Sequence, residues 1–309
     1  MEKIVGRFAP SPSGRMHLGN MFSCLLAWLS ARSAGGEIVL RHEDLDSVRC
    51  KRSYALAIEE DLKWLGLDWD RGGSQGGESY FQSSRREIYE AYLAILEEKG
   101  LVYPCFCSRA DLHAASAPHA SDGTPIYSGA CRGLSREERE LRAASRAPAL
   151  RARVPEEEIS FADGLQGSVS MDLARDRGDF ILRRGDGAFA YQLAVVVDDA
   201  LMGVSQVVRG RDLLGSVPWQ IWLQRELGFS RPEYFHVPLL LSSDGRRLSK
   251  RDGDMDLGQI RSSGISPREL TGRLACWAGL IDRPEPVSPQ ELIPLFSWSK
   301  VPSQDIKVK

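Results

Sequence analysis

Two donor side chains, His17 and Asn20, stand in a Pro/Gly-rich stretch that covers residues 7–20 (RFAPSPSGRMHLGN). Apolar residues precede this stretch, and from Gly19 onward apolar residues recur at helical spacing, which predicts a strand, a loop and a helix. Such a connection aims backbone N–H groups over the loop, and a helix N-terminus favours anions. The stretch therefore predicts an anion site, although an ordinary strand-to-helix connection would also fit the pattern.

Three cysteines gather in the middle of the chain, namely Cys105, Cys107 and Cys131. Clustered thiols suit zinc, which is tetrahedral in structural sites. Generic chemistry would nominate His113 or His119 as the fourth ligand, because both lie between the cysteine groups. The other interpretation is a set of buried or reactive thiols in a loop-rich insertion. Since no nearby residue resembles a general base, a metal here is expected to be structural.

Other candidate residues follow predicted strands. The segment 37–41 (EIVLR) is expected to be a strand that leads to Glu43, and Arg209 follows a valine-rich run that is expected to be a buried strand. Tyr191 falls in the segment 180–193, which is expected to be a hairpin. Open α/β sheets bind ligands beyond the carboxyl ends of their strands, where an arginine can clamp a carboxylate. A solvated acidic loop, a surface ion pair and a half-buried sheet aromatic are the corresponding alternatives.

The elements that position these residues resemble those of the class I aminoacyl-tRNA synthetases, and specifically the glutamyl and glutaminyl branch. Residues 17–20 (HLGN) are similar to the first signature of that family, His-Ile-Gly-His, with Asn20 at the second histidine. Residues 247–251 (RLSKR) are similar to the second signature, Lys-Met-Ser-Lys-Ser, with arginine at its first and last positions. Asparagine still donates a hydrogen bond but carries no charge.

The resemblance implies roles for individual residues. It assigns catalysis to His17 and Lys250, and ATP binding to His17, Asn20 and Lys250. It assigns glutamate binding to Arg7, Phe8, Ala9, Pro10, Ser11, Glu43, Tyr191 and Arg209. Within this set, Glu43 is expected to meet the amino group and Arg7 the side-chain carboxylate. Mg²⁺ is expected to accompany ATP without a dedicated protein cage, because it is held largely by phosphates and water.

The same resemblance bears on the cysteines. The pattern Cys-x-Cys…Tyr-x-x-x-Cys is similar to the zinc site of short paralogues of glutamyl-tRNA synthetase, which implies one structural Zn²⁺ on Cys105, Cys107, Tyr127 and Cys131. A bound metal can lower the pKa of a phenol enough for the phenolate to ligate. The resemblance thus places Tyr127 ahead of either histidine.

The implied fold is an α/β, Rossmann-like catalytic domain with a zinc-binding insertion and a helical C-terminal part that contacts the tRNA stem. Residues 1–100 would form the first half of the catalytic domain and 101–178 the zinc-containing connective insertion. Residues 179–255 would form the second half with the second signature, and 256–309 the helical C-terminal part. No anticodon-binding domain is expected.

The implied activity is that of the short paralogues: ATP-dependent, tRNA-independent activation of L-glutamate, then transfer of glutamate to queuosine in the anticodon loop of tRNA(Asp). The glutamate carboxylate would itself attack the α-phosphorus, so catalysis would come from positioning and from stabilising phosphate charge. One alternative is a truncated glutamyl-tRNA synthetase that charges tRNA(Glu). Another is an inactive paralogue that binds RNA or nucleotide, which the departures at Asn20 and Arg251 motivate.

Length, composition and net charge limit the size, location and partners that can be expected of this protein. The chain has 309 residues, of which 42% are hydrophobic and 27% are charged, enough for a large core in more than one domain. Because no signal peptide or membrane-spanning run is found, a cytoplasmic location without membrane partners is expected, and six cysteines are too sparse for a disulfide framework. A net charge of −2 argues against DNA coating but leaves local RNA contacts open. A monomer is expected.

Overall fold

The computed structural model describes residues 3–108, 111, 126–246 and 256–308. The first half is built on a parallel sheet in the order β1 (Val5–Phe8), β2 (Glu37–Leu40) and β3 (Arg71–Gly72). Helix α1 (Leu18–Ser33) connects the first two strands, and α2 (Arg52–Leu65) connects the second to the third. Parallel strands joined by helices agree with the α/β, Rossmann-like fold that the family resemblance implies.

A second sheet lies beside the first, in the order β7-β6-β10-β9. Strands β9 (Gln206–Gly210) and β10 (Glu233–Val237) run parallel, and β6 (Glu158–Asp163) forms an antiparallel hairpin with β7 (Gly167–Asp172). The hairpin reaches β10 through one residue pair, Tyr234 with Asp163. The two sheets are joined where the Ser205 amide donates to the Val5 carbonyl at 3.0 Å, and α1 packs against both β1 and β9.

The prediction of a hairpin over residues 180–193 is wrong for its second strand, although the turn itself forms. Strand β8 (Ile181–Arg183) does turn back, with one bridge from Arg183 to Phe189, but Tyr191 already begins helix α6 (Tyr191–Leu201). The valines of α6 are buried, and α6 packs against α3 (Arg86–Glu98) and α7 (Val217–Leu227). Burial on several sides thus overrides the strand propensity of a valine run.

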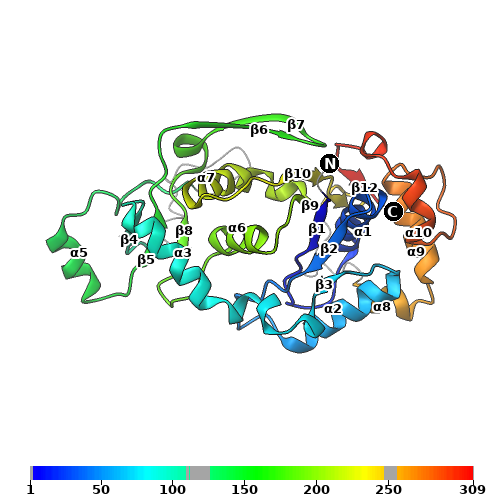
Figure 1. Cartoon of the computed structure of the whole chain (residues 1–309), viewed down its shortest axis with the longest axis horizontal. Coiled ribbons are helices and arrows are strands. Elements are labelled where there is room, and N and C mark those ends of the chain that lie inside the picture. Colours follow the sequence, from blue (N-terminus) through cyan, green and yellow to red (C-terminus); the bar gives the residue numbers. More distant parts are fainter. Residues whose placement is uncertain (1–2, 109–110, 112–125, 247–255, 309) are drawn as a thin grey trace.

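The remaining elements lie at the two ends of the molecule. In Figure 1, α3, α6 and α7 lie toward one end with β4, β5, β8 and α5, whereas α1 lies toward the C-terminal helices. Strands β4 (Val102–Cys105), β5 (Ala149–Ala152) and β8 form an antiparallel sheet beside α5 (Arg136–Ala143). The C-terminal part contains α8 (Leu257–Ser262), α9 (Pro267–Trp277) and α10 (Pro289–Leu292), and the short strands β11 (Leu240–Leu241) and β12 (Ile306–Lys307) pair in parallel.

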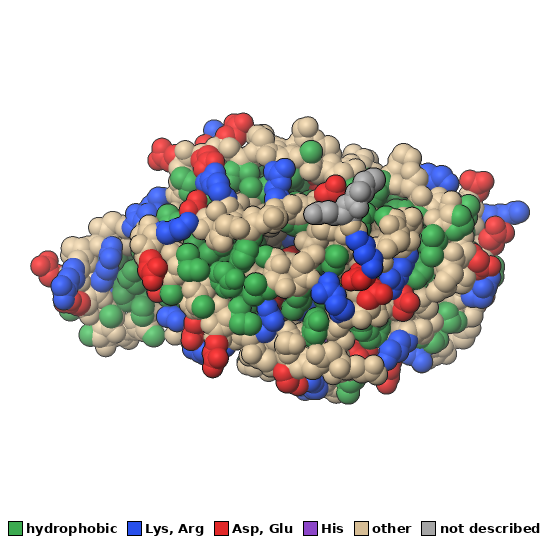
Figure 2. All heavy atoms as spheres, viewed as in Figure 1, with side chains coloured by type: hydrophobic (Ala, Val, Ile, Leu, Met, Phe, Trp, Pro, Cys, Tyr) green, Lys and Arg blue, Asp and Glu red, His purple; other side chains and the backbone are tan. Residues whose placement is uncertain are grey.

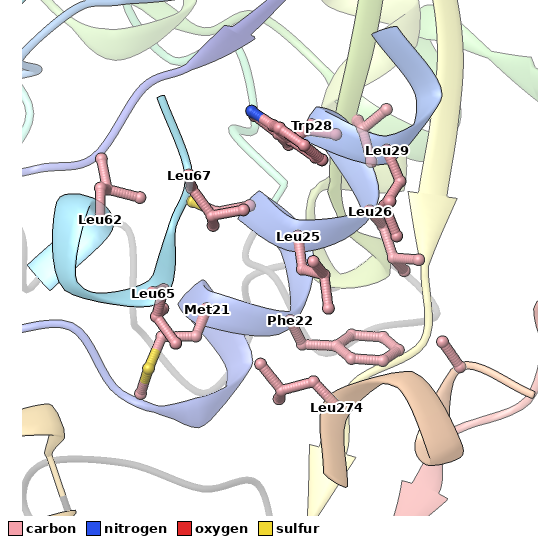
Figure 3. Close-up of a cluster of buried hydrophobic side chains, with 14 of the residues drawn as sticks. Met21, Phe22, Leu25, Leu26, Trp28, Leu29, Leu62, Leu65, Leu67 and Leu274 are labelled. Carbon is pink, nitrogen blue, oxygen red and sulfur yellow. The ribbon is translucent and has the colours of Figure 1, made fainter. Parts of the chain in front are cut away.

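The main core surrounds α1. Figure 3 shows side chains of α1, α2 and α9 meeting there, among them Met21, Phe22, Leu25, Leu62 and Leu274. Each such buried side chain contributes about 1.5–3 kcal/mol relative to exposure. This packing fixes α1 between the first sheet and the C-terminal helices, and it thereby fixes the loop that precedes the helix.

The surface carries charges of both signs. Figure 2 shows Lys and Arg side chains intermixed with Asp and Glu toward the C-terminal helices, and hydrophobic side chains gathered around α3 and α6. Within the described ranges, no helix is both long and apolar enough to cross a membrane.

Candidate active site

A cavity of about 790 Å³ opens beyond the carboxyl ends of β1, β2, β9 and β10, in front of the N-terminus of α1. This is where open α/β sheets bind their ligands. The cavity is lined by these residues of the sequence prediction: Arg7, Phe8, Ala9, Pro10, Ser11, His17, Asn20, Glu43, Tyr191 and Arg209. The structure thus brings together residues from positions 7 to 209, while Lys250 lies outside the described residues.

The N-terminus of α1 forms one wall of this cavity. His17 is the N-cap residue, and its backbone N–H donates to Asn20 Oδ1 at 3.4 Å. The side-chain oxygen of Asn20 is therefore engaged in capping the helix, which leaves the amide nitrogen as the donor available to a ligand. This geometry suits an anion at the helix N-terminus, as the loop predicts.

The segment after residue 255 is attached to the same loop. The Leu257 amide donates to the Met16 carbonyl at 3.0 Å, and Asp256 forms a bridge with His17. Two arginines, Arg15 from the loop and Arg261 from α8, approach the buried Asp61 Oδ1 at 3.0 and 3.5 Å. The chain that follows the second signature is thus held against the first signature.

Beneath the cavity, Arg41 follows β2 and is fully buried in a cluster of carboxylates. Its Nη1 lies 2.7 Å from Asp199 Oδ1, and its Nη2 lies 3.1 Å from Glu43 Oε1. Its Nε lies 3.6 Å from Asp198 Oδ2. Burial acts against the charged form, but Asp199, Asp198 and Glu43 together raise the pKa of Arg41 above its ordinary value.

Glu43, the residue predicted to meet the substrate amino group, lies at the edge of this cluster. Burial raises the pKa of its carboxyl group, while the Arg41 guanidinium acts in the opposite direction. The Glu43 amide also donates to the Pro10 carbonyl at 3.0 Å, which ties the end of β2 to the loop after β1. Glu43 is therefore a fixed carboxylate in the cavity wall, able to accept from an ammonium group.

Arg209 lies on the opposite wall, near the end of β9. Its Nε donates to His236 Nε2 at 3.0 Å, and its Nη1 donates to the Tyr191 hydroxyl at 3.3 Å. Its Nη2 donates to Gln220 Oε1 at 2.8 Å and to the Leu213 carbonyl at 3.5 Å. Among the described residues, every hydrogen-bond acceptor of Arg209 is therefore neutral, although the side chain is almost fully buried.

Arg7 is intermediate between Arg41, which contacts carboxylates directly, and Arg209, which contacts neutral acceptors. Its Nη1 donates to the Val208 carbonyl at 2.8 Å, and its Nε lies 3.8 Å from Asp199 Oδ2, beyond a normal hydrogen bond. Burial lowers the pKa of Arg7, Asp199 acts to raise it, and the nearby Arg209 and Arg41 lower it further. Two incompletely compensated guanidinium groups thus make this end of the cavity suitable for a carboxylate.

Several residues that build this site have no role that the sequence predicts. Asp198 and Asp199 follow a valine run as an acidic pair, but nothing in their own segment indicates that Arg41 would be their partner. His236 and Gln220 carried no local signal, because they meet Arg209 only through the pairing of β9 with β10 and the packing of α7.

The cysteine cluster lies apart from the cavity, at the end of β4. The Sγ atoms of Cys105, Cys107 and Cys131 all lie within 4.8 Å of one another. Tyr127 Oη lies 3.4 Å from Cys105 Sγ and 3.6 Å from Cys107 Sγ. Since zinc–sulfur bonds of about 2.3 Å separate the sulfurs of a tetrahedron by about 3.8 Å, these donors fit a zinc ion. His113 and His119 lie outside the described residues.

A buried cation accompanies this cluster. Arg151 Nε donates to Cys105 Sγ at 3.2 Å, and the Arg151 guanidinium lies 3.9 Å above the centre of the Tyr127 ring. Burial raises the pKa of the Cys107 thiol to about 11, so a metal would have to displace its proton at neutral pH. The cluster can bind a metal such as zinc.

Comparison with known proteins gives the family. The model of tRNA synthetases class I (E and Q), catalytic domain, matches residues 3–300. The chain therefore belongs to this family of class I synthetases, as the two signatures and the α/β fold predict.

Two similar proteins differ in how far the match extends. A glutamyl-Q tRNA(Asp) synthetase of Symbiobacterium thermophilum is 51% identical over 311 residues, which cover 99% of this chain and 96% of that protein. A glutamate–tRNA ligase 2 of Alkalilimnicola ehrlichii is 45% identical over 274 residues, which cover 87% of this chain but only 57% of that protein.

A solved structure supports the fold. The glutamate tRNA ligase of Elizabethkingia meningosepticum, crystallised in complex with its amino acid, superposes with a TM-score of 0.84 at 29% identity. The superposition covers all of this chain and 67% of that protein.

Proposed function

We propose that this chain activates L-glutamate with ATP and transfers the glutamyl group to queuosine in tRNA(Asp). The observation that carries the amino acid assignment is Arg209, a buried cation with neutral acceptors in the cavity wall. A substrate carboxylate would supply the missing negative charge. The near-complete match to a glutamyl-Q tRNA(Asp) synthetase favours queuosine in tRNA(Asp) as the acceptor.

In this proposal, each wall of the cavity has a task. Glu43 accepts a hydrogen bond from the substrate ammonium group, and Arg7, Arg209 and Tyr191 surround the side-chain carboxylate. Glutamine would leave the guanidinium charge without a partner, so the site would reject it. The backbone of residues 8–11 would line the amino acid between the two walls.

The first chemical step needs an aligned nucleophile rather than a strong base. An α-carboxylate oxygen of glutamate attacks the α-phosphorus of ATP, and pyrophosphate leaves. His17, Asn20 and the N-terminus of α1 would stabilise the phosphate charge on one side, and Lys250 would do so on the other. Mg²⁺ would be held by the phosphates of ATP. A nucleophile of queuosine then takes the glutamyl group, and AMP leaves.

The cysteine cluster has a structural task in the same proposal. Cys105, Cys107, Cys131 and Tyr127 would hold one Zn²⁺, which would fix the end of β4 and the segment around residue 131. The close approach of the Tyr127 hydroxyl to two of the sulfurs supports this ligand set. No catalytic step passes through the metal.

Transfer of radiolabelled glutamate tests the acceptor. The purified protein is incubated with ATP and either queuosine-containing tRNA(Asp), the same tRNA without queuosine, or tRNA(Glu). We expect label only on queuosine-containing tRNA(Asp), and we expect glutamate-dependent ATP–pyrophosphate exchange without any tRNA.

Other outcomes would replace the proposal. Label on tRNA(Glu) would establish a tRNA-charging enzyme, the second candidate, which the similarity to glutamate–tRNA ligase 2 favours. Absence of both label and exchange would leave a binding protein without catalysis.

A further inference from the structure

Arg209 is held by an imidazole on the neighbouring strand. In the parallel pairing of β9 with β10, Arg209 lies opposite His236, and Arg209 Nε donates to His236 Nε2 at 3.0 Å. An arginine only donates hydrogen bonds, so this contact requires an unprotonated Nε2. The opposite tautomer of His236 would bring two N–H groups face to face.

The proton of that imidazole is fixed from its other side. His236 Nδ1 lies 2.5 Å from Asp163 Oδ2, and a carboxylate only accepts, so Nδ1 carries the hydrogen. The other carboxylate oxygen, Oδ1, accepts from the backbone amides of Leu165, Gln166 and His236 at 3.0, 2.9 and 3.2 Å. The turn of the β6–β7 hairpin thus holds Asp163, and Asp163 holds His236.

We propose that Asp163 and His236 are positioning residues for amino acid recognition: the hairpin carboxylate sets the tautomer of His236, and that tautomer holds Arg209 toward the cavity. The proposal rests on the proposed function, because it takes Arg209 as the group that meets the glutamate carboxylate. The acceptor on Arg209 must be neutral for this purpose. A carboxylate in direct contact with Arg209 would neutralise the positive charge that the substrate carboxylate must pair with. Arg41, which contacts Glu43 and Asp199, is an example of such a neutralised guanidinium group.

The surroundings of His236 keep it neutral. The charged groups that face it are Asp163 on one side and Arg209 on the other, with Arg7 farther away. Burial, together with the positive charges of Arg209 and Arg7, outweighs Asp163 and lowers the pKa of His236 to about 4. A second positive charge is therefore not placed against Arg209 at neutral pH.

The substitution Asp163→Asn is the sharpest test, because it can preserve the turn and reverse the tautomer. The asparagine oxygen can still accept from the backbone amides, but its NH₂ group would then face His236 Nδ1. His236 would have to move its proton to Nε2, against Arg209. We expect the KM for glutamate in ATP–pyrophosphate exchange to rise at least tenfold, with the KM for ATP changed less than twofold.

Nitrogen-15 spectra of the histidines test the tautomer directly, with the His236 signals identified by their loss in His236→Gln. We expect hydrogen on Nδ1 in the wild type and on Nε2 in Asp163→Asn. A buried aspartate away from the cavity, Asp179, accepts from Tyr103 and Val154 and provides the matched control Asp179→Asn, whose KM for glutamate should not change.

A second pair of variants avoids dependence on the folding of Asp163→Asn. His236→Gln can donate to Asp163 and accept from Arg209, so its KM for glutamate should stay within threefold of wild type. His236→Leu can do neither, and its KM should rise at least tenfold. Equal KM values for the two variants, or a wild-type KM in folded Asp163→Asn, would overturn the proposal.

The proposed function fails in a different way. If wild-type protein shows no glutamate-dependent exchange, the glutamate assignment is wrong, and the positioning role falls with it. If the wild type is active and both Asp163→Asn and His236→Leu keep the wild-type KM for glutamate, only the positioning role is wrong.

Discussion

Arg41 and Arg209 are both buried guanidinium groups near the carboxyl ends of parallel strands, but their partners differ in charge. Arg41 contacts three carboxylates, those of Asp198, Asp199 and Glu43. Arg209 contacts an imidazole, a hydroxyl, an amide and a backbone carbonyl. The positive charge of Arg41 is neutralised by carboxylates of the fold, whereas the positive charge of Arg209 is available to pair with a ligand.

This difference separates a structural cation from a recognition cation. A buried charge is costly unless it is paired, so a protein gains no stability from leaving Arg209 without a carboxylate. Such a local departure from what stability favours is expected at functional sites. Substitution of Arg41 should therefore mainly lower the stability of the protein, whereas substitution of Arg209 should mainly weaken glutamate binding.

The largest expected effect is on stability, from Arg41→Met. Removal of the cation leaves buried carboxylates without their partner, and we expect the free energy of unfolding to fall by about 3–5 kcal/mol in urea titrations. The matched control is Arg49→Met, since Arg49 is exposed and should contribute less than about 0.5 kcal/mol. A loss below about 1 kcal/mol for Arg41→Met would remove the distinction between the two arginines.

The next effect is on binding, from Arg209→Gln. We expect the KM for glutamate to rise about 100-fold, equivalent to about 2.7 kcal/mol, because the substrate carboxylate loses its cation. The free energy of unfolding should change by less than about 1.5 kcal/mol, because no carboxylate is left unpaired. Steady-state exchange kinetics and urea titration of the same protein check both values, and a large loss of stability would contradict the comparison.

A smaller effect should appear in the pH dependence of stability. Burial lowers the pKa of His236 to about 4, below its ordinary value near 6.5, so the unfolded chain takes up the proton first as pH falls. The stability from neutral His236 is therefore complete above pH 6.5 and decreases toward pH 4. Between pH 6.5 and 5 the loss should be about 1.6 kcal/mol in the wild type and should be smaller in His236→Gln. Equal slopes would show that folding does not lower the pKa of His236.

The smallest effect concerns another buried arginine, Arg151, beside the cysteine cluster. If the thiols bind zinc as thiolates, Arg151 becomes a compensated cation like Arg41, and Arg151→Met should weaken zinc binding about tenfold. Tyr127→Phe should also lower the zinc content, whereas His113→Ala should not. Competition with a chelator measures the affinity, and full zinc content in Tyr127→Phe with loss in His113→Ala would reassign the fourth ligand.

Local patterns in the sequence predict much of this molecule. The strand at residues 37–41 and the helix that follows Gly19 are predicted from their apolar patterns, and β2 and α1 lie there. The loop before α1 follows from Pro and Gly, which have strong local preferences. The start of α6 does not follow, because a valine run fits a strand or a buried helix equally, and only its packing against α3 and α7 decides between them.

The residues of the cavity are likewise predictable only in part from local sequence patterns. Residues with a family resemblance, such as Glu43 and Arg209, could be proposed from the sequence and do line one cavity. Asp163 and His236 could not, because 73 residues separate them and each is an ordinary residue in its own segment. Their contact exists only after the β6–β7 hairpin reaches β10, which no local pattern specifies.

The closing of the core by the C-terminal segment has a consequence for synthesis on the ribosome. Strand β12 pairs with β11, Val308 is buried, and Trp298 stacks on Phe235 and donates to Ser30 of α1. An emerging chain can form α1 and the first sheet early, but it cannot complete the surroundings of α1 before residues near 308 have left the exit tunnel. The nascent protein must therefore keep part of this apolar surface uncovered until the segment that contains β12 and Val308 has emerged.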